Sequence, residues 1–153
     1  MWEKLRRFSA LDRTAQALFL RALAMLPLVS WRLRLRGFQN VQAALQKSFP
    51  ACIPERSPDL VKNRAALTAH MVNSADRHGL AHPSCLAKSL TLWWLLGRQG
   101  IVSQLRIGIR KYDNQFEAHA WVERDGAALN EPEEHHHHYA AFDAAFSSLP
   151  QDE

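Results

Sequence analysis

The spacing of apolar residues changes at about residue 100, and this change constrains the fold more than any other feature. Before it, apolar residues recur three or four positions apart, as in Leu11, Ala15 and Leu18, which is helical spacing. After it, Leu105 and Ile107 alternate with polar or small residues, as in a half-buried strand. Helices followed by an antiparallel meander predict an α+β fold with a helical N-terminal region.

Capping residues set the expected bounds of the helices. Ser9 resembles an N-cap of the first helix, and Pro27 is expected to kink or end it. A second short helix is predicted over Val41–Lys47. Ser57-Pro58-Asp59 combines an N-cap, a first-turn proline and an acid, and this pattern predicts a helix that runs to about His78.

The second half of the chain is predicted to form a meander that ends in a helix. Tyr112–Gln115 turns one strand into the next, and Asp125-Gly126 turns that strand into a third over Ala127–Asn130. Pro132 is then expected to open a closing helix. Three aromatic residues share a face of that helix, namely Tyr139, Phe142 and Phe146.

Size and composition indicate one globular domain over residues 1–153. Apolar residues make up 47% and charged residues 22% of the chain, which is ordinary for a globular protein. The only cysteines are Cys52 and Cys85, so the sequence predicts a reducing, cytoplasmic setting without a disulfide framework. The apolar segment Ala15–Trp31 is interrupted by Arg21 and Pro27, which argues against a spanning helix and against a signal peptide. Membrane contact is not expected, although peripheral contact stays open.

Positive charge is concentrated in the N-terminal region, residues 1–50. This region has nine Lys or Arg residues and two acidic ones, a net charge of +7, whereas the remainder has a net charge of −3. Such a region suits an acidic peptide, an acidic protein or anionic lipid, and it is equally typical of a solvated helix face. No nucleic-acid-binding signature accompanies the charge, so nucleic acid is not an expected partner.

Cys85 stands where a thiolate would be stabilised. Pro83-Ser84 precedes it and an apolar helical stretch follows, so the thiol is predicted to lie in the first turn of a helix, near free N–H groups and the positive dipole end. His119 follows in a strand-like run, and Glu131 comes twelve residues later. A thiol, an imidazole and a carboxylate in this order are typical of a cysteine nucleophile with its base and orienting acid.

The length of the turn at 124–126 decides which residue can orient His119. A three-residue turn over Arg124–Gly126 puts Glu131 opposite His119 on one face of the sheet. A two-residue turn moves Glu131 to the other face and brings Asn130 diagonal to His119, where its amide can take the orienting role. Trp121 lies on the face of His119 in either case, and we expect it to bind substrate or to shield the imidazole.

Four segments together resemble one family: Pro83–Leu86, Leu96–Gly100, Leu105–Ile109 and Ala118–Glu123. They are similar to the transglutaminase-like cysteine proteases of lasso peptide biosynthesis, which remove the leader segment from a precursor peptide. The resemblance covers about residues 80–131. It implies a papain/transglutaminase-like core over 57–150, in which the cysteine helix packs on an antiparallel sheet, beside the basic helical region 1–50.

The same resemblance implies a catalytic set of Cys85, His119 and Glu131, where the family most often has aspartate as the acid. It favours Glu131 over the alternative Asn130. It also implies three partners: the precursor's leader segment, a small leader-recognition protein and a downstream macrolactam-forming cyclase. No cofactor or metal is implied.

Two alternatives to this interpretation are kept. An amidase or acyltransferase acting on another peptide would use the same residues, and a non-catalytic peptide-binding module would retain only the fold.

The run His135–His138 is interpreted as an incidental exposed tract rather than a metal site.

Overall fold

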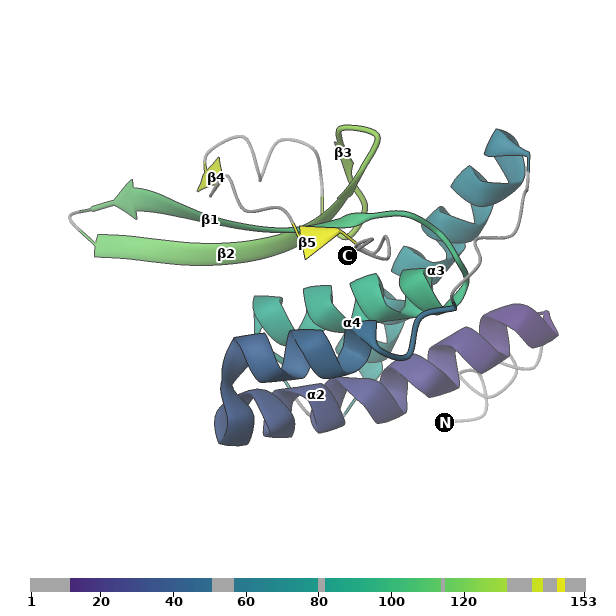
Figure 1. Cartoon of the computed structure of the whole chain (residues 1–153), viewed down its shortest axis with the longest axis horizontal. Coiled ribbons are helices and arrows are strands. Elements are labelled where there is room, and N and C mark those ends of the chain that lie inside the picture. Colours follow the sequence, from purple (N-terminus) through teal and green to yellow (C-terminus); the bar gives the residue numbers. More distant parts are fainter. Residues whose placement is uncertain are drawn as a thin grey trace.

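Helices pack beneath a curved antiparallel sheet in the computed structural model (Figure 1). The structure describes residues 12–50, 57–79, 82–113, 115–131, 139–141 and 146–147. The helices are α2 (Arg13–Gln46), α3 (Pro58–His78) and α4 (Cys85–Arg98). The strands are β1 (Gln104–Tyr112), β2 (Gln115–Arg124), β3 (Ala127–Ala128), β4 (Ala140–Ala141) and β5 (Phe146–Ser147). This arrangement confirms the predicted α+β fold with a helical N-terminal region.

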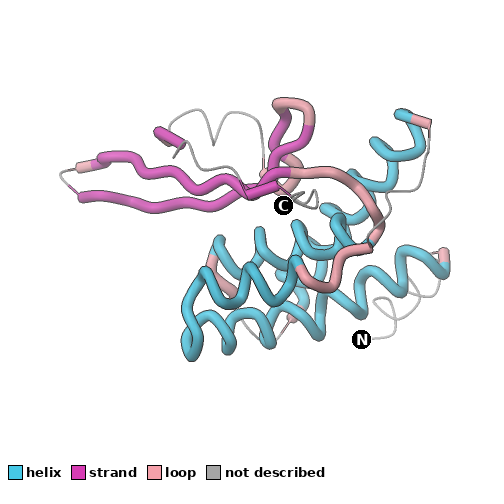
Figure 2. Tube along the Cα trace, in the orientation of Figure 1, coloured by secondary structure: helices cyan, strands magenta, loops and turns pink. Residues whose placement is uncertain are grey.

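Helix α4 is the central element, because it contacts both other helices and the sheet. Figure 2 shows the strands on one side of the molecule and the helices on the other. The side chains of Leu90, Trp93 and Leu96 on α4 are fully buried. Burying large apolar side chains on several faces is what fixes a short helix between two layers.

The predicted helix from Ser57 is confirmed, because α3 begins after Ser57 and ends at His78. Helix α4 begins at Cys85, as predicted, and ends at Arg98.

Pro27 does not end the first helix, which was one of the two outcomes predicted for it. Helix α2 continues through Pro27 and consists of two helical segments joined by a kink at Gly37, with φ 74°. The second segment, which ends at Gln46, corresponds to the short helix predicted over Val41–Lys47. Leu26 and Val29 on either side of Pro27 are buried, so packing on α3 and α4 outweighs the lost backbone hydrogen bond. The side chain of Asp12 caps this helix by accepting from the Ala15 N–H at 2.8 Å, while Ser9 lies outside the described residues.

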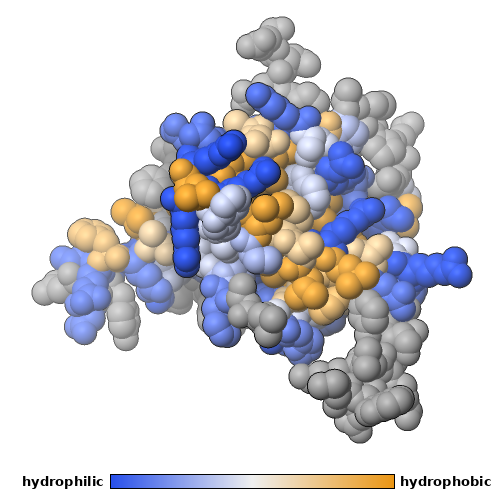
Figure 3. Space-filling model, turned by 90° about the horizontal axis from the view of Figure 1, so that it is seen from below, coloured by the Kyte–Doolittle hydropathy of each residue, from blue (hydrophilic) through white to orange (hydrophobic). Residues whose placement is uncertain are grey.

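Helix α2 is also long and apolar enough to span a membrane, judged by length and composition alone. Its most apolar window has a mean hydropathy of 1.3 and is 28% buried. Core helices of soluble proteins and N-terminal signal sequences have the same composition, so this is weak evidence. Figure 3 shows hydrophobic residues among hydrophilic ones on the underside of the molecule. Trp31 and Leu35 on α2 are exposed, at 60% and 63%.

The sheet has the order β3-β2-β1-β4, and β5 also pairs with β1. In the β1–β2 hairpin Gly108 lies opposite His119. The following turn is the two-residue form, because Arg124 pairs with Ala127 and both Asp125 and Gly126 have positive φ. The third strand is shorter than predicted and ends at Ala128.

The predicted closing helix is wrong over the residues that the structure describes. Ala140–Ala141 and Phe146–Ser147 form strands β4 and β5 on the edge of β1 that β2 does not occupy. An open strand edge presents unpaired N–H and C=O groups, and pairing with these groups competes with helical periodicity. Gly108 permits this approach, since a Cβ there would lie 3.0 Å from the Ala140 carbonyl oxygen. Pro132 and Phe142 lie outside the described residues.

Candidate active site

The candidate nucleophile, Cys85, is the first residue of α4 and is half-buried. Ser84 caps this helix, because its hydroxyl accepts the Ala87 N–H at 3.2 Å and its carbonyl accepts the Lys88 N–H at 3.0 Å. The backbone N–H groups of Ala120 and Leu86 also help to lower the pKa of the Cys85 thiol. The helix start therefore surrounds the sulfur with donors that favour its charged form.

His119 lies on β2, directly above the start of α4, and joins the thiol to a carboxylate. Its Nε2 lies 2.6 Å from Oε2 of Glu131, and its ring also hydrogen-bonds the Cys85 side chain. Because Glu131 occupies Nε2, Nδ1 is the ring nitrogen that remains for the thiol. The side chains of His119 and Glu131 are 17% and 11% exposed, so water screens this contact only partly.

The proton distribution follows from these contacts. The hydrogen bond from His119 is the largest cause that lowers the pKa of the Cys85 thiol, and it outweighs the opposing effect of burial. The hydrogen bonds to Cys85 and Glu131 raise the pKa of His119 to about 9. Both shifts favour a thiolate beside an imidazolium at neutral pH.

The structure places Glu131 beside His119, although the turn that was expected to bring it there does not form. A two-residue turn should have put Glu131 on the other face of the sheet. That argument assumed a regular ladder, and the ladder ends at Ala128. Residues 129–131 bend away from strand geometry, so alternation of faces no longer determines where Glu131 points.

Asn130 explains where the ladder ends. Leu129 donates its N–H to the Val122 carbonyl at 2.9 Å, but the Val122 N–H donates to the side-chain Oδ1 of Asn130, also at 2.9 Å. In a regular antiparallel pair the Leu129 carbonyl would accept that second hydrogen bond. The Asn130 side chain thus accepts the hydrogen bond in place of a backbone carbonyl. The strand pairing ends here, and the chain that follows turns toward His119.

Asn130 therefore does not lie where its alternative role as orienting amide requires. It is 5% exposed, and its Nδ2 donates to the Ser89 hydroxyl at 3.1 Å. Ser89 in turn donates to the Ala120 carbonyl at 2.8 Å, which ties α4 to β2 next to the site. Sequence reasoning missed Ser89, and the available signal was its position one helical turn after Cys85.

Replacing Asn130 with alanine should destabilise the protein by about 1–3 kcal/mol, because the Val122 N–H and the Ser89 hydroxyl lose buried partners. Urea unfolding of the variant would measure this loss. Asn130→Asp is the matched variant, since it retains the oxygen that accepts from Val122. An alanine variant as stable as the wild type would contradict the structural role.

Trp121 is too buried to line an open groove. It is 3% exposed, and its ring lies 6.2 Å from that of His119 at an interplanar angle of 18°. The prediction that Trp121 binds substrate does not fit this position, whereas the prediction that it shields the imidazole does.

Tyr139, which was expected on a helix, lies with its ring 5.0 Å from the His119 ring. The Arg110 guanidinium covers Tyr139 at 4.7 Å.

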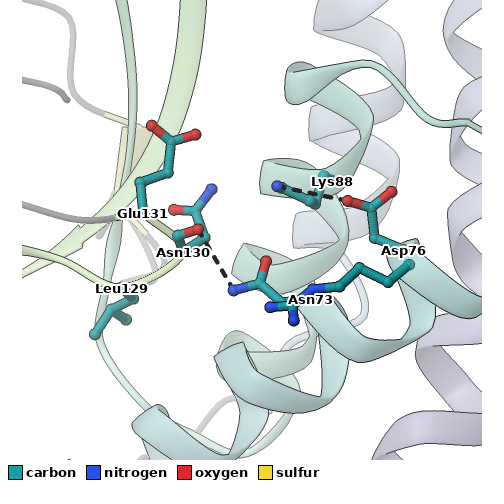
Figure 4. A pocket seen from close by; sticks show the side chains of 7 residues that line it. Asn73, Asp76, Lys88, Leu129, Asn130 and Glu131 are labelled. Carbon is teal, nitrogen blue, oxygen red and sulfur yellow. Dashed lines mark hydrogen bonds and ion pairs between the residues drawn. The ribbon is translucent and has the colours of Figure 1, made fainter.

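A polar pocket of about 330 Å³ opens beside Glu131 (Figure 4). Lys88 on α4 and Asp76 on α3 form an ion pair across it at 3.6 Å. Its lining residues are Asn73, Asp76, Arg77, Lys88, Leu129, Asn130 and Glu131. We name it the α3-side pocket.

Within the described part of the chain, no group of three or more His, Cys, Asp or Glu side chains could hold a metal ion. Cys52 and the run His135–His138 lie outside the described residues. The residues of the candidate site are instead arranged for thiolate chemistry, which needs no metal to generate the nucleophile.

The family model of the transglutaminase-like superfamily matches residues 22–142. The chain therefore belongs to the transglutaminase-like superfamily. It has a fold of the cysteine protease and acyltransferase type. Searches of curated proteins and of solved structures gave no match.

Proposed function

We propose that this protein is a cysteine peptidase that removes the leader segment from a lasso peptide precursor. The observation that carries the enzymatic part is the continuous contact from the Cys85 thiol through His119 to Glu131, with Nε2 and Oε2 2.6 Å apart. A buried contact of this kind orients the imidazole and stabilises its charged form. The choice of substrate rests on the resemblance of residues 80–131 to leader peptidases.

In the acylation step the Cys85 thiolate attacks the carbonyl carbon of the scissile peptide bond. The carbonyl oxygen becomes negatively charged as the carbon–sulfur bond forms. The protonated His119 then gives its proton to the departing amine, and the carbon–nitrogen bond breaks. The product of this step is a thioester on Cys85.

In the deacylation step the neutral His119 takes a proton from water, and the resulting hydroxide attacks the thioester. The carbon–sulfur bond breaks, and the thiolate returns beside the imidazolium. Glu131 holds the ring in place through Nε2. Transfer of the acyl group to an amine instead of water would make the enzyme an acyltransferase.

The backbone N–H of Cys85 is the natural donor to the developing oxyanion. The N–H groups of Ala87 and Lys88 bond to Ser84, and that of Leu86 helps to lower the pKa of the Cys85 thiol. Among the described residues at this helix start, the Cys85 N–H is thus left for the substrate oxygen. A donor that acts on the transition state in this way contributes about 3–4 kcal/mol in other enzymes.

Glu131→Gln should shift the alkaline limit of activity to lower pH. The thiolate–imidazolium pair is lost as pH rises through the pKa of His119, which is about 9 in the intact site. Removing the carboxylate removes one of the causes that raise this pKa, so activity should fall off at a lower pH. A pH profile of kcat/KM would measure the shift, with Glu131→Asp as the charge-retaining control. An unchanged alkaline limb would contradict the role of Glu131.

The proposed partners are the precursor's leader segment, a small leader-recognition protein and a macrolactam-forming cyclase, all in the cytoplasm. The test is to incubate the purified protein with a precursor, with and without the recognition protein, and to identify products by mass spectrometry. One cut at the end of the leader supports the proposal. Transfer of the peptide to an added amine without hydrolysis would indicate an acyltransferase instead of a peptidase. Recovery of the intact precursor would contradict the proposed function.

A further inference from the structure

A second pocket lies on the other side of Cys85 and is formed mainly by α2. Its volume is about 280 Å³, and its lining residues are Ser30, Leu33, Arg34, Phe38, His82, Ser84 and Leu86. Two of them, Ser84 and Leu86, are the immediate neighbours of Cys85 in the chain. We name it the α2-side pocket.

The periodicity of α4 sets the two pockets on opposite sides of Cys85. Successive residues of an α-helix are about 100° apart, so Leu86 and Lys88 lie on opposite sides of Cys85 around the helix axis. Leu86 lines the α2-side pocket, and Lys88 lines the α3-side pocket of Figure 4. A peptide whose carbonyl reaches the thiolate at this helix start therefore passes next to the α2-side pocket.

The lining of the α2-side pocket suits an apolar side chain. Leu33, Phe38 and Leu86 are half-buried and pack against the hydrophobic core, so the wall that they form is held in place. The left-handed conformation of Gly37 interrupts α2 between the first two of these residues. A volume of about 280 Å³ is just below the range of pockets that enclose whole small ligands, and it suits one bulky side chain.

The charge of α2 indicates which kind of residue lies next to that apolar side chain in the substrate peptide. The exposed Arg34 also lines the pocket, and α2 carries no Asp or Glu in its 34 residues. Its positive charge comes from five arginines, Arg13, Arg21, Arg32, Arg34 and Arg36. An arginine-rich surface without acidic residues attracts and orients acidic peptide segments.

We propose that the α2-side pocket binds a bulky apolar side chain of the peptide substrate next to the bond that Cys85 attacks, with an acidic residue of the same peptide against Arg34. This inference rests on the proposed function, because it assumes that Cys85 attacks a peptide. It adds the substrate's side-chain chemistry, which the resemblance to leader peptidases does not supply.

The test uses short peptides that carry a vinyl sulfone in place of the scissile bond. The Cys85 thiolate adds to the alkene carbon β to the sulfone, a proton goes to the α carbon next to the sulfone, and the enzyme is labelled without hydrolysis. The residues next to the vinyl sulfone are varied in turn among Leu, Phe, Ala and Asp. We expect Leu or Phe at one position to label Cys85 at least about 10-fold faster than Ala, and an added Glu to increase the rate further at low salt.

Variants assign the preference to the pocket. Ser30→Leu adds bulk to the half-buried wall of the pocket, so it should lower the ratio of the Leu or Phe rate to the Ala rate toward one. Arg34→Glu should turn the gain from the added Glu into a loss. Leu35→Ala is the matched control, because Leu35 lies on the same helix, is 63% exposed and does not line the pocket.

The outcomes separate this inference from the proposed function. Fast labelling of Cys85 by all peptides alike, or a Leu preference that survives in Ser30→Leu, would overturn the subsite and leave the nucleophile standing. Labelling of Cys85 by every peptide no faster than by a simple alkylating reagent would overturn both.

Discussion

Cys85→Ala should lower the rate of peptide cleavage by at least about 1000-fold, to the level that binding alone can support. The thiolate is the only group in the described site that can form the acyl-enzyme, so no neighbouring side chain replaces it. Cys85 is half-buried at a helix start that is capped by Ser84, and the cap does not depend on the thiol. The variant should therefore stay folded, and its circular dichroism and melting temperature would check this.

Cys52→Ala is the matched control for this loss, since it removes the other cysteine of the chain. It should leave the rate unchanged. Cleavage by Cys85→Ala at a rate near that of the wild type would exclude the proposed nucleophile. A loss in both variants would assign the effect to thiols in general rather than to Cys85.

His119→Ala should have the second largest effect, again a loss of about 1000-fold or more near neutral pH. The variant loses the proton donor for the leaving amine and the hydrogen bond that most lowers the pKa of Cys85. Its remaining activity should rise with pH as the thiol ionises at a higher, more ordinary pKa. A pH profile of single-turnover acylation would show this rise, which a merely structural defect would not produce.

His70→Ala is the control for His119→Ala, because His70 is an exposed residue of α3 on the helical side of the molecule. It should retain the wild-type rate and pH profile. A His119→Ala enzyme that keeps both the rate and the acid limb of the wild type would contradict the role of the imidazole.

Local signals predicted the elements that carry Cys85 and His119. Ser84 next to Cys85 indicated a helix start, and α4 begins there. Alternation in 105–110 and 116–123 predicted the hairpin that holds His119. These elements follow from capping and from short-range periodicity, which depend on neighbouring residues alone.

The position of Glu131 could not be predicted in this way, because it depends on a tertiary contact. The Asn130 side chain takes a hydrogen bond that a regular strand would give to the Leu129 carbonyl, and Ser89 of α4 holds that side chain in place. Only the packed fold brings Ser89 to Asn130. Strands β4 and β5 were not predicted for a related reason. The spacing of apolar residues after Pro132 favours a helix, but β4 and β5 instead pair with the edge of β1 that β2 leaves open.

The central claim is that Cys85 is a thiolate paired with an imidazolium at neutral pH. The most direct measurement is the rate of alkylation of Cys85 by iodoacetamide as a function of pH, in the wild type and in His119→Ala. The account predicts that the wild type already reacts rapidly at about pH 6.5, whereas the variant reacts only as an ordinary thiol ionises at about pH 8.5. Identical profiles with a single rise near the ordinary thiol pKa in both proteins would contradict it.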